Sequence, residues 1–326
     1  MPRKKLWPTL LALSAALALT GCGSAAAPSF SHPAAAPAAS GGAKTVVYRS
    51  SLPLSTVAAN LQAGLKKAGW LVPQQFDVET HLAKVVKVPP SYLMDVVPPR
   101  TVGAIVAADP AAGLAFPLRV YLYRQGGVTY ASYLEPSSVL ARWASHIPDL
   151  SSLTKSLDTE LAGMVAAATH GTTVTAPEAS TPGQKVQTQS LAAGVHTQQA
   201  VAKLLTQITA NHWGLNNQHS LATLLAPTGV KVPTGYYVEA FNAKLAGQVM
   251  NANLPAGIEI PLRFYFYRQG GKLYLSYLEP STIFARYHDA TLDRLSQKMN
   301  AVVSNVAAST AAGMSAAKAA GGVGCG

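Results

Sequence analysis

The chain has 326 residues, of which 49% are hydrophobic and 12% are charged, and its formal net charge is +11. This composition excludes an intrinsically disordered protein and is sufficient for two hydrophobic cores of about 120 residues each. Three of the 25 Lys and Arg residues lie at the extreme N-terminus, so the other 22 face 14 Asp and Glu, a net charge of +8. These positive charges are scattered and form no basic stripe with interleaved aromatic residues, which argues against a nucleic-acid partner.

The N-terminus has the pattern of an export signal. A basic cluster, Arg3 to Lys5, precedes an uncharged run rich in Leu and Ala, Leu6 to Thr20, which is too short for a comfortable membrane span. The run continues into Leu-Thr-Gly-Cys at Cys22, which resembles the lipobox of bacterial lipoproteins. We therefore predict a lipoprotein signal peptide over residues 1–21 and a diacylated Cys22 as the first mature residue. An ordinary signal peptide with an incidental cysteine is the alternative.

The residue after the lipobox bears on the choice of membrane. Gly23 stands where an inner-membrane retention signal would place Asp, so the resemblance favours the outer membrane, facing the periplasm. Residues 22–44 are almost entirely Ala, Ser, Pro and Gly and are predicted to be a flexible tether. With Cys22 alkylated, Cys325 has no partner in its own chain, which excludes an intramolecular disulfide. Cys325 is expected to be a free thiol in a disordered tail, residues 313–326, with an intermolecular disulfide as the alternative.

Residues 45–170 are predicted to form a first α+β repeat. Hydrophobic periodicity, β-branched content and Gly or Pro breaks indicate strands alternating with helices. We expect a helix that Ser55 or Thr56 caps and that ends at Gly69. The other expected elements are strands at 45–50, from 70, 92–97, 118–123 and 128–134, and helices at 102–108, 136–143 and 150–169.

A second repeat follows a short linker. Residues 171–185 are rich in Thr, Pro, Ala and Gly and have no periodicity, so they are predicted to connect two domains. Residues 186–312 then repeat the first order of elements, with a strand at 186–190 and a helix from Thr197. A closing helix is expected from Ser281 to about Ser309.

The sequence of one predicted hairpin occurs twice in the chain. Residues 116–143 and 260–287 are related by a constant offset of 144, and 18 of their 28 positions are identical. Each copy carries a Gly-Gly pair between runs rich in Val, Leu, Phe and Tyr, a strong signal for a tight primed turn. The chain is therefore a tandem duplication. Its predicted fold class is α+β, with two copies of a small antiparallel or mixed sheet and helices packed on one face.

The order of motifs resembles the bacterial domain-of-unknown-function family numbered 302. In each copy a helix leads to Trp70 or Trp213, and Pro-Leu-Arg, an aromatic strand, the Gly-Gly hairpin and Ser-Tyr-x-x-Pro follow further along. The resemblance covers nearly all of residues 45–142 and 187–286. It implies an α+β fold that often dimerises and has no established activity. The two copies are accordingly expected to pack as an internal pseudo-dimer within a monomer.

The familiar motifs of catalytic and metal sites are absent from the sequence. There is no His-x3-His, no HExxH, no cysteine pair for zinc and no Gly-x-Ser-x-Gly elbow. The Gly-Gly pairs lack the Lys-Ser/Thr of a phosphate loop. No catalytic residue, metal site or cofactor is predicted, and Ser132 and Ser276 are expected to be cross-strand hydroxyls.

A shared face of arginine and tyrosine is the remaining candidate site. Strand alternation places Val120 and Leu122 in the core and their neighbours on the opposite face. The candidate binding face consists of Arg119, Tyr121, Tyr123 and Tyr130 in the first copy and Arg263, Tyr265, Tyr267 and Tyr274 in the second. This face is either covered by the closing helix or the other copy, or it binds a small ligand or an envelope protein. Glu135 and Glu279 are expected to be ion-pair partners of the arginines.

These observations predict a non-catalytic cell-envelope lipoprotein, attached to the membrane through Cys22, with a binding or accessory role. The alternative is an envelope enzyme or a redox or sulfur-metabolism accessory protein. That alternative requires a polar site that the sequence does not display. A deep pocket in which His81, Asp109 and Glu135 converge would support it.

Overall fold

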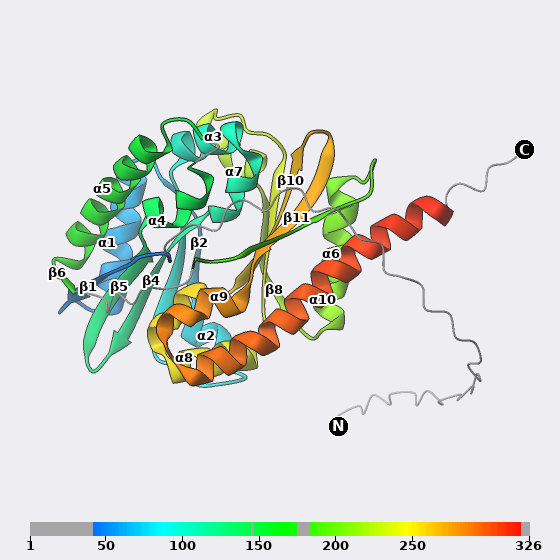
Figure 1. The fold of residues 1–326 in the computed structure, drawn as a ribbon. Coiled ribbons are helices and arrows are strands. Elements are labelled where there is room, and N and C mark those ends of the chain that lie inside the picture. The colour runs from blue at the N-terminus through cyan, green and yellow to red at the C-terminus, as the bar shows by residue number, and fades with distance from the viewer. Residues whose placement is uncertain (1–41, 145–146, 175–182, 321–326) are drawn as a thin grey trace, which may run out of the picture. The chain divides into compact units, whose positions relative to one another are not determined.

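The structure is a computed structural model that describes residues 42–144, 147–174 and 183–320 (Figure 1). The expected signal peptide, the expected lipidation site at Cys22, most of the expected tether, and Cys325 lie outside the described residues. The described residues form two antiparallel sheets with helices packed around them, which confirms the α+β fold class.

The first repeat contains a six-stranded sheet in the order β2-β3-β4-β5-β1-β6. Every neighbouring pair is antiparallel. Its strands are β1 (Thr45–Ser50), β2 (Leu71–Asp77), β3 (Ser91–Val97), β4 (Leu118–Gln125), β5 (Val128–Leu134) and β6 (Thr172–Val174). Its helical segments are α1 (Leu54–Lys67), α2 (Val78–Leu82), α3 (Pro99–Ala108), η1 (Pro110–Ala115), α4 (Pro136–Leu140), η2 (Ala141–Trp143) and α5 (Leu150–Thr169).

The second repeat contains a five-stranded antiparallel sheet in the order β7-β11-β10-β9-β8. Its strands are β7 (Val186–Ser190), β8 (Gly214–Ser220), β9 (Gly235–Phe241), β10 (Leu262–Gln269) and β11 (Lys272–Leu278). Its helical segments are α6 (Thr197–Ala210), α7 (Leu221–Leu225), η3 (Ala226–Thr228), α8 (Ala243–Ala252), η4 (Leu254–Glu259), α9 (Pro280–Phe284), η5 (Ala285–Tyr287) and α10 (Ala290–Ala320).

The two hairpins form as predicted. Gly126 and Gly127 have φ angles of 57° and 80°, and Gly270 and Gly271 have φ angles of 56° and 77°. Glycine adopts this left-handed region without steric cost, which is why the Gly-Gly pair can close a two-residue turn. The turn fixes the register, and Tyr123 pairs with Tyr130 in the first repeat as Tyr267 pairs with Tyr274 in the second.

Three local predictions are wrong at their boundaries. Helix α1 begins at Leu54 behind Pro53, whose fixed φ suits a helix entry, so neither Ser55 nor Thr56 caps it. Residues 172–174, expected to be linker, pair with β1 as the edge strand β6. The expected closing helix is interrupted at His288, which has a φ angle of 48°.

The C-terminal end of the closing helix also differs from the prediction. After the interruption, α10 continues to Ala320 and so enters the segment, residues 313–326, that was expected to be disordered. The cause is composition, because Ala is the strongest helix former and the segment contains several. No helix among the described residues combines the length and apolar character that a membrane span requires.

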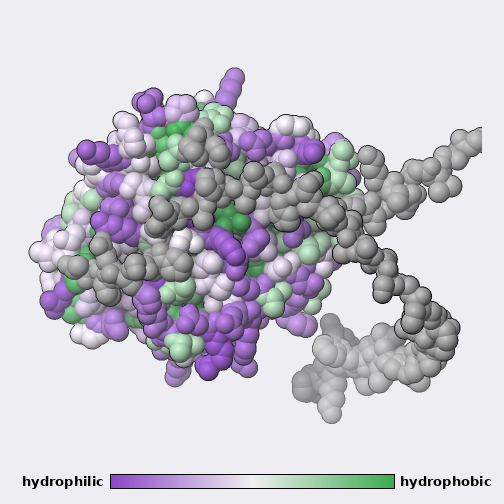
Figure 2. Space-filling view, in the orientation of Figure 1, coloured by the Kyte–Doolittle hydropathy of each residue, from purple (hydrophilic) through white to green (hydrophobic). Residues whose placement is uncertain are grey.

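Each sheet packs helices against one face to form a core. In the first repeat the core side of the hairpin consists of Val120, Leu122, Ala131 and Tyr133, all buried as predicted. Helices α1 and α5 cover this face, and α6 and α10 cover the corresponding face in the second repeat. Hydrophobic residues lie scattered among hydrophilic ones on the molecular face drawn in Figure 2.

Candidate functional site

On the face opposite its core, each sheet contacts the other repeat, and these contacts are reciprocal. The Tyr121 hydroxyl lies 2.5 Å from the position that a Cβ on Gly257 would occupy, and the Tyr265 hydroxyl lies in the same way against Gly113. Each pair is the other shifted by 144 residues. A contact from the first repeat to the second is thus matched by the equivalent contact from the second repeat to the first. This reciprocity is the mark of an isologous interface, as in a twofold dimer. The two repeats therefore pack around an internal pseudo-twofold axis.

A second reciprocal pair extends this relation. The side chain of Val86 packs directly over the Cα of Gly247, and Val230 packs over Gly103 in the same way. Both glycines lie within helices, α8 and α3, where the missing side chain lets another repeat approach the backbone closely. The contact is therefore built from the same small and branched residues on both sides of the axis.

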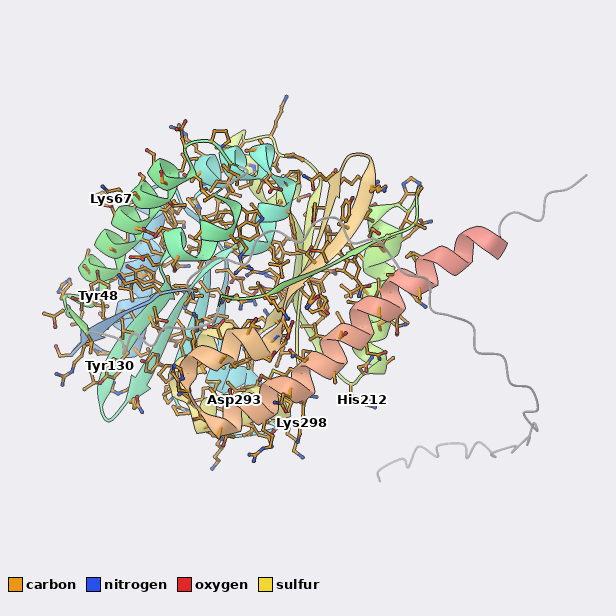
Figure 3. The ribbon with its side chains drawn as sticks, in the orientation of Figure 1. Tyr48, Lys67, Tyr130, His212, Asp293 and Lys298 are labelled. Carbon is orange, nitrogen blue, oxygen red and sulfur yellow. The ribbon has the colours of Figure 1, made fainter. Side chains whose placement is uncertain are left out.

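The predicted tyrosine face lies inside this interface. Tyr121 and Tyr265 are fully buried, and Tyr123 and Tyr267 are 4% and 5% exposed. Tyr130 and Tyr274 are half-buried, and Tyr130 lies on β5 toward the hairpin tip (Figure 3). The rings stack along each hairpin, with centroids separated by 5.3 Å for Tyr121 and Tyr123 and 5.8 Å for Tyr265 and Tyr267. The sequence left open whether this face is covered or binds a ligand. In the structure the other repeat covers Tyr121 and Tyr265.

The arginines of the same face form a buried charged cluster with two carboxylates. Arg119 faces Asp95 across β4 and β3, and Arg263 faces Glu239 across β10 and β9. Glu239 accepts hydrogen bonds from both arginines: from Nη2 of Arg119 at 2.7 Å, and from Nε and Nη2 of Arg263 at 3.0 and 2.7 Å. Asp95 lies 3.6 Å from Nε of Arg119. One carboxylate thus holds an arginine from each repeat.

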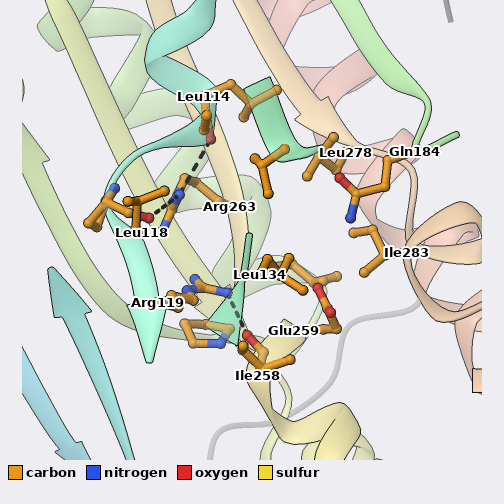
Figure 4. Close-up of a pocket in the computed structure, with 15 residues that line it drawn as sticks. Leu114, Leu118, Arg119, Leu134, Gln184, Ile258, Glu259, Arg263, Leu278 and Ile283 are labelled. Atoms are coloured by element: carbon orange, nitrogen blue, oxygen red, sulfur yellow. Dashed lines mark hydrogen bonds between the residues drawn. The ribbon is translucent and has the colours of Figure 1, made fainter. Parts of the chain in front are cut away.

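The arginines also bind backbone carbonyls across the axis. Nη1 of Arg119 donates to the Ile258 carbonyl at 3.3 Å, and Nη1 of Arg263 donates to the Leu114 carbonyl at 3.4 Å (Figure 4). These two bonds are again related by 144 residues. Each arginine is therefore fixed by its own sheet and by the η segment of the other repeat.

The two carboxylates have opposite pKa shifts. Glu239 is fully buried, and although burial alone would raise its pKa, the charges and hydrogen bonds of Arg119 and Arg263 hold that pKa below its ordinary value. Burial raises the pKa of Asp95 to about 7, and the negative charge of Glu239 contributes to the same rise. The difference follows from side-chain length, because the Glu carboxylate reaches both arginines and the Asp carboxylate remains beside one.

A polar column continues from the cluster along the pseudo-twofold axis. The Asn216 amide donates to Glu239 at 3.3 Å and to the Gln74 side chain at 3.3 Å. Gln74 also accepts a hydrogen bond of 2.5 Å from Asn217. These two residues are equivalent, because Gln74 pairs with Asp95 in its sheet as Asn217 pairs with Glu239, although their offset is 143. These amides lie on β2 and β8 and are half-buried. They connect the buried cluster to the partly exposed side of both sheets.

A cavity of about 90 Å³ lies on the other side of the arginines. Seven pairs of equivalent residues line it: Leu114 and Ile258, Ala115 and Glu259, Pro117 and Pro261, Leu118 and Leu262, Arg119 and Arg263, Leu134 and Leu278, and Val139 and Ile283. Gln184 completes the wall (Figure 4). Because each repeat contributes the same set, the cavity lies on the pseudo-twofold axis. Its walls are mainly aliphatic and two arginines stand at one end.

A second pair of buried arginines flanks the cavity. Arg286 contacts the Glu259 carboxylate, which also accepts a hydrogen bond of 3.1 Å from the Tyr287 hydroxyl. The equivalent Arg142 donates to the Gln184 side-chain oxygen at 3.1 Å. Burial lowers the pKa of Arg142 to about 10, so its guanidinium remains charged at neutral pH.

The expected pairing of Glu135 and Glu279 with the arginines is wrong. Glu135 lies 3.8 Å from Lys44 and Glu279 lies 3.9 Å from Lys185, each at the end of its hairpin. Asp95 and Glu239, the carboxylates that bind the arginines, were not identified. Two signals could have found them: each interrupts an otherwise apolar strand, and the two are separated by the same 144 residues as Arg119 and Arg263.

The residues named for a catalytic alternative lie on separate features. His81 bonds the Asp77 carbonyl on α2, Asp109 accepts a hydrogen bond from the Ala111 N–H at the start of η1, and Glu135 pairs with Lys44. Within the described ranges, no group of three His, Cys, Asp or Glu side chains is placed to hold a metal ion.

One family model matches this chain twice, once in each repeat. The family model "Domain of unknown function DUF302" matches residues 46–168 and again residues 188–307. A crystal structure of an uncharacterized conserved DUF302 protein from Bacillus stearothermophilus is similar, with a TM-score of 0.36 and 17% sequence identity over 38% of this chain and 97% of that one. No curated protein matches the sequence. The chain therefore belongs to the DUF302 family, of unknown function, and carries two copies of its domain in tandem.

Proposed function

We propose that this protein is a non-catalytic, lipid-anchored binding protein of the bacterial cell envelope, and that its ligand is a small molecule held in the cavity on the pseudo-twofold axis. The observation that carries the proposal is the cavity itself, which both repeats line with equivalent residues beside a fixed pair of arginines. Concave sites with aliphatic walls and a few placed polar groups are the usual form of small-ligand sites.

The charge around the cavity favours an anionic ligand. Arg119 and Arg263 line it, and Arg142 and Arg286 contact the lining residues Gln184 and Glu259. The carboxylates that bind these arginines are Glu239 and Glu259. Asp95 adds little negative charge below neutral pH because burial raises its pKa to about 7. A buried excess of positive charge is costly unless an anion compensates it, and a bound anion would supply that compensation.

The tyrosines of the predicted face have an indirect part in this proposal. Tyr121 and Tyr265 contact the glycines of the opposite η segments, which carry the carbonyls that Arg119 and Arg263 bind. Only the arginines of that face line the cavity. The tyrosines therefore position the η segments, and the arginines face the ligand.

The volume limits the size of the ligand. A cavity of about 90 Å³ can hold several water molecules or a molecule of about six non-hydrogen atoms. Native mass spectrometry of the Cys22→Ser chain, purified from its own host, should detect a small molecule that leaves on denaturation. Val139→Phe should eliminate this species by filling the cavity, whereas Val85→Phe, at a residue that is 59% exposed, should retain it. Binding that survives Val139→Phe would contradict the proposed site.

The membrane attachment is tested separately. Lipidation of Cys22 is proposed from the lipobox-like Leu-Thr-Gly-Cys run, and the outer membrane is proposed from Gly23. Replacement of Cys22 by Ser should move the protein from the membrane fraction to the soluble fraction, and labelling with a fatty-acid analogue should be lost in parallel. A Cys22→Ser chain that remains in the membrane fraction would refute the anchor.

A further inference from the structure

One pair of equivalent positions gives the two ends of the cavity different charges. On the side of the second repeat, Glu259 reaches into the wall and its carboxylate contacts Arg286 and the Tyr287 hydroxyl. On the side of the first repeat, the equivalent of Glu259 is Ala115, which has no carboxylate. The cavity is therefore symmetric in its framework and asymmetric in its charge.

Arg142 stands behind the end that lacks the carboxylate. It is 7% exposed, its guanidinium lies 5.3 Å from the centroid of the Trp143 ring, and its Nη2 donates to Gln184. No described residue accepts a hydrogen bond from its Nε. Among the described residues, no Asp or Glu lies within ion-pair distance of Arg142, in contrast to Arg286. Arg142 is thus a buried cation that, among the described residues, donates its side-chain hydrogen bond to a neutral amide in the cavity wall.

The equivalent tyrosine is also replaced. Tyr287 donates its hydroxyl to Glu259, whereas the first repeat has Trp143, which offers an indole in place of that hydroxyl. The first repeat has therefore lost both the carboxylate and its second donor while retaining the arginine. A buried arginine kept without its carboxylate is poorly stabilised unless another anion occupies the same position.

We infer that the cavity binds a small monocarboxylate whose carboxylate group lies beside Ala115 and pairs with Arg142, in the position that Glu259 occupies in the other half. This inference rests on the proposed function and specifies its ligand class. The aliphatic part of the ligand contacts Leu118, Leu134 and Val139, which line the same end of the cavity. Gln184 is placed to donate its amide N–H to the carboxylate, since its oxygen already accepts from Arg142.

The pairing of the other arginines indicates that the ligand carries a single carboxylate. Glu239 binds Arg119 and Arg263, and Glu259 contacts Arg286, so Arg142 is the one of these four arginines that has no carboxylate partner among the described residues. A planar carboxylate matches the fork of a guanidinium. The ligand therefore carries one such group and an uncharged remainder.

Butyrate and butyramide are suitable probes, because they have the same number of non-hydrogen atoms and differ in charge. We would titrate each into the Cys22→Ser chain with ¹³C-labelled methyl groups and follow Leu118, Val139 and Ile283, which line the cavity. Butyrate is expected to shift these methyl signals and to bind about tenfold or more tightly than butyramide, as a charge-assisted pair requires.

Two variants assign the effect to Arg142. Arg142→Met keeps an unbranched apolar stem, removes the guanidinium, and should abolish the preference for butyrate over butyramide. Ala115→Glu supplies the missing carboxylate from the chain, so it should raise the melting temperature and prevent butyrate binding. Ala115→Gln, of the same size without the charge, should not raise the melting temperature.

The outcomes separate this inference from the proposed function. Equal binding of butyrate and butyramide to the cavity would overturn the carboxylate assignment and leave a small-molecule site in place. A preference for butyrate that persists in Arg142→Met would overturn the role of Arg142. If neither probe shifts the cavity methyl groups, both the carboxylate assignment and the proposed site are wrong.

Discussion

The two repeats of this chain have the same framework and different charges. Asp95 and Glu239 occupy equivalent positions, and the second repeat has the longer carboxylate of this pair. Ala115 and Glu259 are also equivalent, and there the second repeat alone has a carboxylate. In a homodimer both halves of a twofold site must carry the same residue, whereas a tandem chain can change one half alone. The duplication thus allows one glutamate, Glu239, to bind two arginines, and it places Ala115 in the first repeat where the second has Glu259.

The repeats also differ after their long helices. The first repeat ends α5 at His170, which has a φ angle of 47°, and adds β6 to the edge of its sheet. The second repeat continues α10 to Ala320, and β7 remains the edge strand of its sheet. The difference lies at the outer edges of the sheets, far in the topology from β3, β4, β9 and β10, which carry the charged cluster.

The largest expected effect tests the unequal shares of the two carboxylates. Glu239→Gln removes the carboxylate that binds both arginines and should destabilise the protein by about 3–5 kcal/mol, the usual cost of leaving a buried charge unpaired. The matched change Asp95→Asn should cost far less, because Asp95 lies 3.6 Å from one arginine. Urea unfolding at pH 7 measures both. Equal losses of unfolding free energy would contradict this prediction, because they would mean that Asp95 and Glu239 stabilise the arginines equally.

The second prediction concerns pH. Burial raises the pKa of Asp95 from 3.8 to about 7, so between these values the folded state keeps a proton that the unfolded state has released. Asp95 therefore contributes its full stability below pH 3.8, and this contribution is lost as the pH rises to about 7, with a slope of at most about 1.4 kcal/mol per pH unit. Asp95→Asn should remove this slope from the free energy of unfolding. An unchanged pH profile would show that Asp95 titrates normally.

The third prediction tests the reciprocity of the interface. Gly113→Ala and Gly257→Ala each place a methyl group against a buried tyrosine hydroxyl of the other repeat and should each cost about 1–3 kcal/mol. Gly64→Ala, in α1 with nothing within 4 Å of the added carbon, should instead stabilise by about 0.5–1 kcal/mol. Thermal unfolding compares the three. A loss at only one of the two interface glycines would show that the contacts are not equivalent.

The smallest effect is expected at the hairpin tips. Gly126→Val and Gly270→Val force a β-branched residue into φ angles of 57° and 56°, which should cost about 1 kcal/mol or more in each repeat. Because the two turns have the same sequence and conformation, the two losses should agree. A melting temperature unchanged by either substitution would refute the role of the glycine in that turn.

The sequence predicted the parts of the fold that depend on local pattern. Gly126-Gly127 identifies the turn, and alternation along β4 separates Val120 and Leu122 from Tyr121 and Tyr123 correctly. The pattern cannot distinguish a face covered by another repeat from a face open to a ligand, because aromatic residues suit both. The pairing of Arg119 with Glu239 is equally invisible, since it joins strands 120 residues apart.

Other residues escaped prediction for a different reason. Asp95 and Glu239 were overlooked because a single carboxylate in a strand is usually assigned to the solvent side, and here both are buried, at 2% and 0% exposure. The offset of 144 residues was the available signal. Gln184 could not have been found from the sequence, because its place in the cavity wall depends on a tertiary contact with Arg142, 42 residues away in the chain.

The central claim is that the two repeats form one structural unit around the shared cluster of Arg119, Glu239 and Arg263. Differential scanning calorimetry of the Cys22→Ser chain tests it most directly. A single transition, with equal calorimetric and van't Hoff enthalpies, is predicted because Glu239 of the second repeat binds Arg119 of the first, and each repeat buries a tyrosine of the other against a glycine. Two resolved transitions, with Glu239→Gln shifting only one of them, would contradict the claim.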